Sequence, residues 1–144
     1  MRRNKNRGYQ KLRVWIDAIS YYEKTCSVFR NLPYELKRVA SQAIASSDSV
    51  HRSISEDYCR RSIREYIQFL YIALASLGKS VSGLQAYRRA KQIGEKEFQE
   101  LDTMAYKLEN GLLRLVESLE NKRERREWID TLMVKESNAV YGNE

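Results

Sequence analysis

The sequence predicts an all-α protein, an antiparallel up-and-down four-helix bundle. From Leu12 onward, apolar residues recur every three or four positions in four successive blocks, which is the spacing of amphipathic helices. The chain has one proline and six glycines, and 31% of its residues are charged, a composition more typical of helical proteins than of β-rich or disordered ones. Its 144 residues suffice for one domain with a substantial core.

We expect three parts along the chain: a basic N-terminal arm over residues 1–8, the bundle over residues 9–120, and a charged C-terminal extension over residues 121–144. The extension contains a short apolar patch made by Trp128, Ile129, Leu132 and Met133. Whether this patch prolongs the fourth helix, packs on a neighbour or frays stays open at this point.

The first helix is expected over about residues 9–30. Pro33 follows it and suits the first turn of a second helix over about residues 34–55. The inward stripe of the first helix is predicted to be Leu12, Trp15, Ile16, Ile19, Tyr22, Cys26 and Phe29. That of the second is predicted to be Leu36, Val39, Ala40, Ala43, Ile44, Ser47, Val50 and Ile54.

The third helix is expected from about Arg60 to Ile93, with Gly94 ending it and Glu95 opening the fourth. The corner at residues 56–59 lacks glycine and proline, so it is either tight or partly helical. The third stripe is predicted to be Ile63, Tyr66, Ile67, Leu70, Ala73, Leu74, Leu77, Val81 and Leu84. The fourth is predicted to be Phe98, Leu101, Ala105, Leu108, Leu112, Leu115, Val116 and Leu119.

A third helix of this span would be about 50 Å long, against about 32 Å for the first two. Unless it kinks near Gly78 and Gly83, it is expected to overhang them at the end away from the chain start. The overhang would expose Leu84, Tyr87, Arg88, Arg89 and Ile93. A partner subunit is one way to cover such a surface.

Basic residues concentrate in three segments, 1–13, 52–65 and 120–127, which an up-and-down bundle brings to one end; we call this end the basic pole. The segments hold 14 basic and 6 acidic residues, whereas the rest of the chain holds 12 and 13. The basic residues of the pole are Arg2, Arg3, Lys5, Arg7, Lys11, Arg13, Arg52, Arg60, Arg61, Arg64, Lys122, Arg123, Arg125 and Arg126. A charged pole on a nearly neutral body favours a polyanionic partner.

These residues are the predicted phosphate contacts of a nucleic-acid-binding protein, most plausibly one that binds RNA. Tyr9 and Tyr58 lie near them in the sequence and are candidates for stacking on unpaired bases. Two alternatives remain. The chain is a protein-interaction module that binds no nucleic acid, or the basic arm is only a solvated tail.

The sequence carries no signature of an enzyme, a cofactor or a metal site. The serines of residues 41–55 lack a Gly-x-Ser-x-Gly elbow, and the glycines form no phosphate loop. His51 is the only histidine, and Cys26 and Cys59 resemble neither a metal pair nor a disulfide framework. No apolar stretch is expected to cross a membrane, so a cytoplasmic protein is predicted.

Several short motifs occur in order over residues 9–119. They are Leu12-x-Val14-Trp15, Leu32-Pro33-x-Glu35, Ser41-Gln42, Ser53-Ile54-Ser55-Glu56 and Phe69-Leu70-Tyr71-Ile72-Ala73-x-Ala75-Ser76-Leu77. The set resembles the four-helix-bundle family named for proteins encoded in intervening sequences of large-subunit rRNA genes. The fourth motif is similar to the family's Asn-Ile-Ala-Glu-Gly stretch, but Ser53 replaces the asparagine and Asp57 the glycine. Lys79 stands at what looks like a glutamate position.

The resemblance implies an antiparallel bundle that assembles into a ring-shaped homopentamer with no enzymatic activity. The same fold class includes the accessory variability proteins of diversity-generating retroelements, which are basic pentamers that bind RNA and a reverse transcriptase. The basic pole favours this side of the family. The expected partners are therefore RNA or another nucleic acid, further copies of the chain, and a reverse transcriptase.

Overall fold

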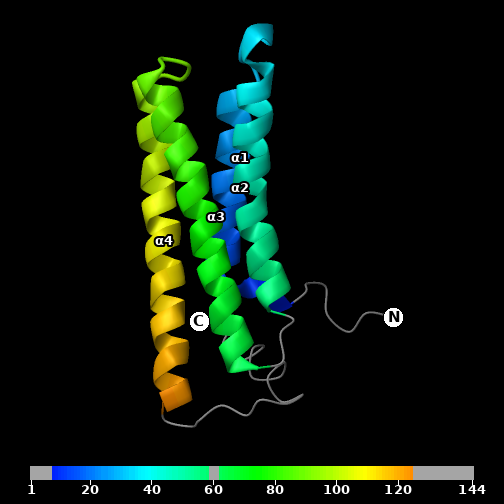
Figure 1. Ribbon diagram of the computed structural model, residues 1–144, viewed down its shortest axis with the longest axis vertical. Helices are drawn as coiled ribbons and strands as arrows, with labels where there is room; N and C mark the ends of the chain where they lie inside the picture. The colour runs from blue at the N-terminus through cyan, green and yellow to red at the C-terminus, as the bar shows by residue number, and fades with distance from the viewer. Residues whose placement is uncertain (1–7, 59–61, 125–144) are drawn as a thin grey trace, which may run out of the picture.

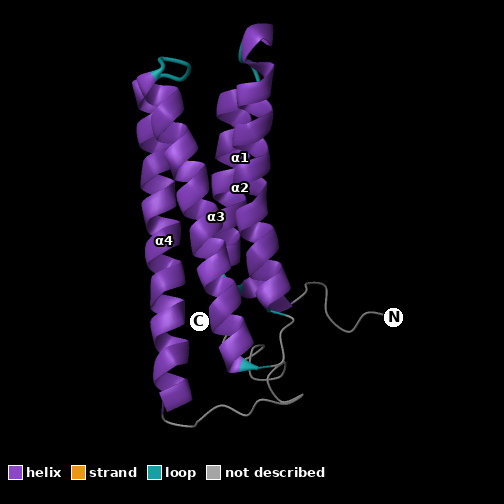
Figure 2. Cartoon of the chain, viewed as in Figure 1, coloured by secondary structure: helices purple, strands orange, loops and turns teal. Residues whose placement is uncertain are grey.

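The computed structural model describes residues 8–58 and 62–124, and in these ranges the protein is a helical bundle without strands (Figure 2). The prediction of an all-α bundle is confirmed. The four helices are α1 (Arg13–Phe29), α2 (Lys37–Asp57), α3 (Ile63–Arg89) and α4 (Glu95–Glu124). Two short 3-10 helices precede α1 and α2, namely η1 (Gly8–Lys11) and η2 (Tyr34–Leu36).

The helices lie side by side along the long axis, and their ends gather at two poles (Figure 1). The start of α1, the end of α2, the start of α3 and the end of α4 lie at the lower end of the view. The connections from α1 to α2 and from α3 to α4 lie at the upper end. Each helix packs on the next one along the chain, and α1 also packs on α4.

The core is one cluster to which all four helices contribute. The stripes predicted for the last two helices are confirmed, because in α3 and α4 their members are buried or, for Leu74, Val81 and Leu115, half-buried. Of the second stripe, Ala43, Ser47, Val50 and Ile54 are buried, and the other predicted members are half-buried, with Leu36 in η2 rather than α2. Their regular leucine and alanine spacing placed these faces correctly.

The stripe predicted for the first helix is partly wrong. The buried residues of α1 are Val14, Ala18, Tyr21, Thr25 and Phe29. Of the predicted members, Trp15, Ile19, Tyr22 and Cys26 are half-buried, and Ile16 is 48% exposed. The helix is therefore rotated relative to the apolar pattern, with Tyr21 rather than Tyr22 facing the interior.

Hydrogen bonds explain why polar groups occupy this interior face. The Tyr21 hydroxyl pairs with the Ser80 hydroxyl at 2.7 Å, inside the bundle. Thr25 Oγ1 donates to the Tyr21 carbonyl oxygen at 2.8 Å. A buried hydroxyl with a partner avoids the cost of burying it unpaired, so these residues fill core positions that hydrophobicity alone would give to others.

The second corner ends at a helix cap that was not predicted from the sequence. The Ser62 side chain accepts a hydrogen bond from the Glu65 backbone N–H at 3.0 Å, so Ser62 is the N-cap of α3. The helix therefore begins at Ile63 rather than near Arg60. A serine three residues before a glutamate is a recognised helix start.

The end of α3 also differs from the prediction, because Lys91 and not Gly94 takes the left-handed conformation, with φ at 60°. The Gln92 N–H donates to the Tyr87 carbonyl (2.8 Å) and the Lys91 N–H to the Arg88 carbonyl (3.0 Å). This pair of bonds is the Schellman termination. Gly94 instead starts the next helix, because its carbonyl accepts from the Phe98 N–H.

The predicted overhang of the third helix is wrong. Leu84 and Ile93 are only 1% and 9% exposed. The Tyr87 ring packs edge-on against Phe29 with the centroids 5.7 Å apart, and the Arg88 guanidinium lies 4.5 Å from the Phe98 ring centroid. The helix ends four residues early, and α1 and α4 cover its last turns. The large apolar residues that remain exposed lie elsewhere: Ile16, Tyr34, Tyr71, Ile72, Tyr106 and Leu113.

Among the described helices, α3 is long and apolar enough, by length and composition alone, to cross a membrane. No such stretch was predicted from the sequence. In the bundle this helix contributes Leu70, Ala73 and Leu77 to the core. Core helices of soluble proteins commonly pass the same test.

Candidate nucleic-acid interface

The predicted basic pole is only partly covered by the described residues. Those that lie outside are Arg2, Arg3, Lys5, Arg7, Arg60, Arg61, Arg125 and Arg126. Those described are Lys11, Arg13, Arg52, Arg64, Lys122 and Arg123. The helix ends that carry this second set lie together at the lower end of the bundle (Figure 1).

The six described residues differ in their surroundings. Lys11, Arg13, Arg64 and Arg123 are exposed, whereas Lys122 is half-buried. Arg52 is exposed but engaged, because its Nε donates to Asp48 Oδ2 at 2.5 Å. Local ion pairing therefore reduces the charge that Arg52 can offer to a phosphate.

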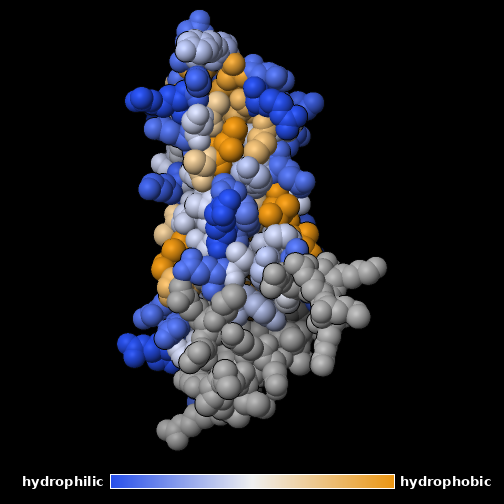
Figure 3. Space-filling view, turned by 90° about the vertical axis from the view of Figure 1, so that its right-hand side faces the viewer, coloured by the Kyte–Doolittle hydropathy of each residue, from blue (hydrophilic) through white to orange (hydrophobic). Residues whose placement is uncertain are grey.

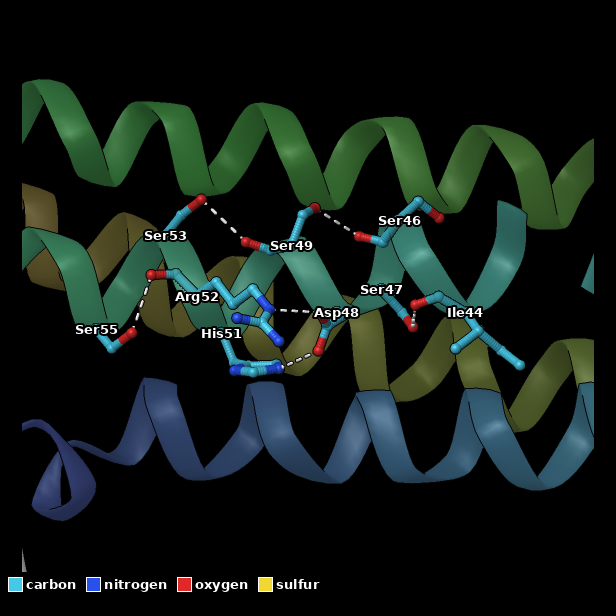
Figure 4. A network of polar contacts seen from close by, with 9 residues as sticks. All are labelled: Ile44, Ser46, Ser47, Asp48, Ser49, His51, Arg52, Ser53 and Ser55. Atoms are coloured by element: carbon cyan, nitrogen blue, oxygen red, sulfur yellow. Dashed lines mark hydrogen bonds and ion pairs between the residues drawn. The ribbon is translucent and has the colours of Figure 1, made fainter. Parts of the chain in front are cut away.

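Asp48 joins two cationic or titratable groups on α2 (Figure 4). Besides the bond from Arg52, His51 Nε2 donates to Asp48 Oδ1 at 2.6 Å. Partial burial acts to raise the pKa of the Asp48 carboxyl, but the hydrogen bonds from Arg52 and His51 outweigh it and leave the pKa below its usual value. The His51 ring also packs against Tyr22, with centroids 5.5 Å apart. His51 is thus held as a half-buried side chain at the contact between α1 and α2.

The charge surplus of the basic pole is unevenly distributed. Within its three segments, the described residues hold six basic and five acidic side chains. The segments 1–7, 59–61 and 125–127 therefore supply most of the net positive charge. The bundle itself offers cations at this end, but they alternate with carboxylates.

A groove between α1 and α4 adds cations next to the pole. It has a volume of about 280 Å³, and Arg13, Lys107 and Arg114 line it. Asp17 is the only carboxylate among the lining residues, and it lies 3.5 Å from Lys107 Nζ. The groove thus has a surplus of two positive charges over an apolar floor that includes Leu12.

Gly111 lets the two helices come close enough to form this groove. A Cβ at this position would lie 3.1 Å from Val14 Cγ1, which is tighter than an ordinary van der Waals contact. The absence of a side chain here therefore permits the α1–α4 approach, with Arg13 on one wall and Arg114 on the other.

Lys107 and Arg114 were not predicted as site residues, because they lie in the nearly neutral body of the chain. Their separation of seven residues places both on one face of a helix, which was the available signal. Nothing in the local sequence indicated that this face borders Arg13. That neighbourhood depends on the packing of α1 against α4.

The two tyrosines predicted to stack on bases are brought together at this end. The Tyr9 ring lies 6.4 Å from the Tyr58 ring and 5.4 Å from the Trp15 ring, in edge-on arrangements. All three side chains are half-buried. Their rings are therefore engaged with one another, which makes them parts of an aromatic cluster rather than free stacking platforms.

The serines of α2 have a structural role. Ser46, Ser47, Ser49, Ser53 and Ser55 each donate to a backbone carbonyl three or four residues earlier, at 2.7–3.1 Å. Figure 4 shows the bonds of the last four. Over residues 8–58 and 62–124, no group of three or more His, Cys, Asp and Glu side chains is arranged to hold a metal ion. Cys26 is a half-buried free thiol, and Cys59 lies outside the described residues.

Comparison with known proteins agrees with this helical architecture. No curated protein matches the chain. The family model described as 23S rRNA-intervening sequence protein matches residues 10–114, which include most of α1 to α4 and all of the motifs noted in the sequence. The match covers well over half of the chain, which therefore belongs to the family of 23S rRNA-intervening sequence proteins.

Proposed function

We propose that this protein is a non-enzymatic nucleic-acid-binding scaffold or accessory protein, with RNA as its preferred ligand. The observation that carries the proposal is the basic groove between α1 and α4, which lies beside the basic pole. Arg13, Lys107 and Arg114 line it against a single carboxylate. Together with the predicted basic arm, this surface suits the phosphate backbone of a nucleic acid.

The proposed mechanism is electrostatic. Each Lys or Arg that neutralises a phosphate releases condensed counterions, so the affinity is independent of sequence and falls as salt is raised. The apolar floor of the groove, which includes Leu12 and Leu115, gives the sugars a surface to contact. Positioning is thus provided by the bundle, and most of the free charge by the pole.

We also propose that the bundle is antiparallel and up-and-down and that it assembles as a homopentamer. The alternating helix ends in Figure 1 support the topology. The incompletely buried stripe of α1, which includes Ile16, Ile19 and Tyr22, supports an interface between subunits. A ring would repeat the groove about five times, and the effective concentration of linked sites would strengthen weak contacts.

Within this proposal, a reverse transcriptase of a diversity-generating retroelement is the partner protein, and the cytoplasm is the place of action. The likeness to accessory variability proteins and the formal net charge of +7 support this assignment. An RNA-binding ring would then hold the template near the polymerase.

Fluorescence anisotropy with a labelled RNA over a salt series tests the nucleic-acid proposal. The double variant Lys107→Ala/Arg114→Ala removes two groove cations, and Lys24→Ala/Lys79→Ala removes two cations that lie outside this groove and outside both charged ends of the bundle. We expect the groove variant to bind more weakly and its salt slope to fall by about 1.4, since each phosphate contact with a single strand contributes about 0.7. The control should keep the wild-type slope.

The alternative is a protein-interaction module that binds no nucleic acid. The exposed Tyr71 and Ile72 on α3, with Tyr106 and Leu113 on α4, favour it as apolar contact residues. If the wild-type protein gives no anisotropy change at micromolar concentration and low salt, the RNA proposal is wrong and this alternative stands.

A further inference from the structure

The end of the bundle opposite the basic pole is itself positively charged. The segments 30–38 and 88–97, which form the two upper connections in Figure 1 and the helix ends beside them, hold seven basic and three acidic residues. All of them are described by the structure, whereas the described part of the basic pole holds six and five. Within the described chain, the larger surplus therefore lies at the upper end.

A groove opens on this end between the last turn of α1 and the first turns of α2. Its volume is about 560 Å³, against about 280 Å³ for the groove between α1 and α4. Leu32 and Ile44 contribute apolar surface to it, and Arg30 and Lys37 are its only charged lining residues. Hydrophobic surface is visible between hydrophilic flanks in the upper half of the face shown in Figure 3. An occupant with an apolar part and negative charge complements such a lining.

Tyr34 gives the groove an aromatic wall. Its side chain lines the groove and is 82% exposed, the highest exposure among the large hydrophobic residues of the described chain. Lys37 Nζ lies 5.6 Å from the centroid of the Tyr34 ring. Lys37 directly follows η2 and is the first residue of α2, so this turn brings the ring and the ammonium group together.

We propose that this groove binds one nucleotide of a single-stranded RNA. The base stacks on Tyr34 and contacts Leu32 and Ile44, and the flanking phosphates are neutralised by Arg30 and Lys37. Stacking of bases on exposed aromatic rings beside a cationic track is the general mode of single-strand recognition. The site is separate from the basic pole and extends the proposed function to a second surface at the far end of the bundle.

A flat aromatic ring beside two cations selects this occupant over other polyanions. A duplex keeps its bases stacked inside, so its phosphates alone would reach Arg30 and Lys37, and Tyr34 would contribute nothing. An acidic peptide would also satisfy the two charges without needing the ring. Dependence on Tyr34 therefore separates a single strand from both.

The experiment measures binding of the full chain to a labelled ten-nucleotide oligouridylate and to an RNA duplex of the same length. Tyr34→Ala removes the stacking wall, and Tyr71→Ala removes a tyrosine that is 53% exposed on α3 as its control. Lys37→Ala removes a groove cation, and Arg38→Ala removes the adjacent exposed cation that does not line the groove. Circular dichroism checks that each variant is helical.

We expect Tyr34→Ala to weaken binding of the single strand by at least about fivefold, the lower limit for one base–aromatic stack, and to leave duplex binding unchanged. Lys37→Ala should weaken both RNAs more than Arg38→Ala does. Equal affinity of Tyr34→Ala and wild type for the single strand would overturn the proposal, as would equal losses for both RNAs. Displacement of the oligouridylate by a polyglutamate peptide, equally from wild type and from Tyr34→Ala, would also overturn it.

The proposals for the upper groove and for the α1–α4 groove can be tested separately. If Tyr34→Ala and Lys37→Ala bind the single strand normally while Lys107→Ala/Arg114→Ala does not, the proposal for the upper groove is wrong and the proposed function stands. If only the upper variants lose binding, the α1–α4 groove is the wrong surface. If wild type binds neither RNA, both proposals are wrong.

Discussion

The hydroxyl groups of Tyr21 and Ser80 form a hydrogen bond of 2.7 Å in the interior of the bundle, and it links α1 directly to α3. Tyr21 is fully buried and Ser80 is 4% exposed, so water does not compete for either group. The pair directs the Tyr21 face of α1 toward α3. This hydrogen bond also explains how the two hydroxyl groups, one on α1 and one on α3, can be buried in the core.

Removing one member of this pair should destabilise the fold by leaving the other unpaired. We expect Tyr21→Phe to lower the free energy of unfolding by about 1–3 kcal/mol, because the Ser80 hydroxyl stays buried without its partner. The double variant Tyr21→Phe/Ser80→Ala should lose less than the sum of the single variants. Urea denaturation measures these values, with Tyr71→Phe on the surface as the control; strict additivity would contradict the interpretation.

Because of Tyr21, we also expect the fold to lose stability at high pH. Burial raises the pKa of Tyr21 to about 12, against the opposing effect of the Ser80 hydrogen bond and with a further increase from the negative charge of Asp102. Because the pKa is higher in the folded state, the contribution is complete below the unfolded value of 10.0 and is lost as pH rises from there through about 12. Tyrosinate absorbance should show a group that titrates near pH 12 in wild type and is missing in Tyr21→Phe.

Because of Asp48, we expect the stability of the fold to depend on pH in the acidic range. Hydrogen bonds from Arg52 and His51 outweigh the effect of burial and lower its pKa, so its contribution is present above the usual value of 3.8 and disappears as pH falls through the lower folded value. We expect Asp48→Asn to lower the free energy of unfolding by about 1 kcal/mol at neutral pH, a modest value because the carboxyl is partly exposed. The difference in the free energy of unfolding between Asp48→Asn and wild type should shrink below pH 3.8. If this difference stays constant down to the folded pKa of Asp48, the interpretation is wrong.

Ser62 should be a stabilising cap for α3. Replacing it by alanine removes the acceptor of the Glu65 N–H and is expected to lower the free energy of unfolding by about 1 kcal/mol. Ser62→Asp keeps an acceptor and should behave like wild type. If alanine and aspartate have equal effects, the cap does not contribute to stability.

Lys91 offers a stabilising substitution. It is exposed, and its φ of 60° is unfavourable for a residue with a Cβ. We expect Lys91→Gly to raise the free energy of unfolding by about 1 kcal/mol, because glycine adopts this conformation without strain. Lys96→Gly, inside the first turn of α4, is the control and should destabilise the protein. A lower melting temperature for Lys91→Gly would contradict the prediction.

The sequence predicted the helices best where the apolar pattern was regular. Leucines and Phe98 mark the inner face of α4 at constant spacing, and this face is buried as predicted. In α1 the adjacent Tyr21 and Tyr22 are equally apolar, so hydrophobicity could not choose between them. The choice depends on Ser80, which is 59 residues from Tyr21 in the sequence.

Helix ends and the basic surface depended on contacts that no local pattern contains. Gly94 was expected to end α3, but backbone hydrogen bonds to the carbonyls of Tyr87 and Arg88 end it sooner and place Lys91 in the left-handed turn. Likewise, Lys107 and Arg114 became part of a basic groove only through the neighbouring helix, which Gly111 allows to approach. Charge counts along the chain predicted a basic end of the bundle, but not that Lys107 and Arg114 border Arg13.

The serine hydroxyls of α2 have a mechanical consequence. Ser46, Ser49 and Ser53 lie on the side of α2 next to α3 in Figure 4, and each is already bonded to a carbonyl of its own helix. These groups can therefore slide past α3 without breaking a bond between helices, whereas Tyr21 resists the same displacement of α1. At these positions the α2–α3 contact, the most extensive between any two helices of the described chain, therefore depends on close packing and not on the serine hydroxyls.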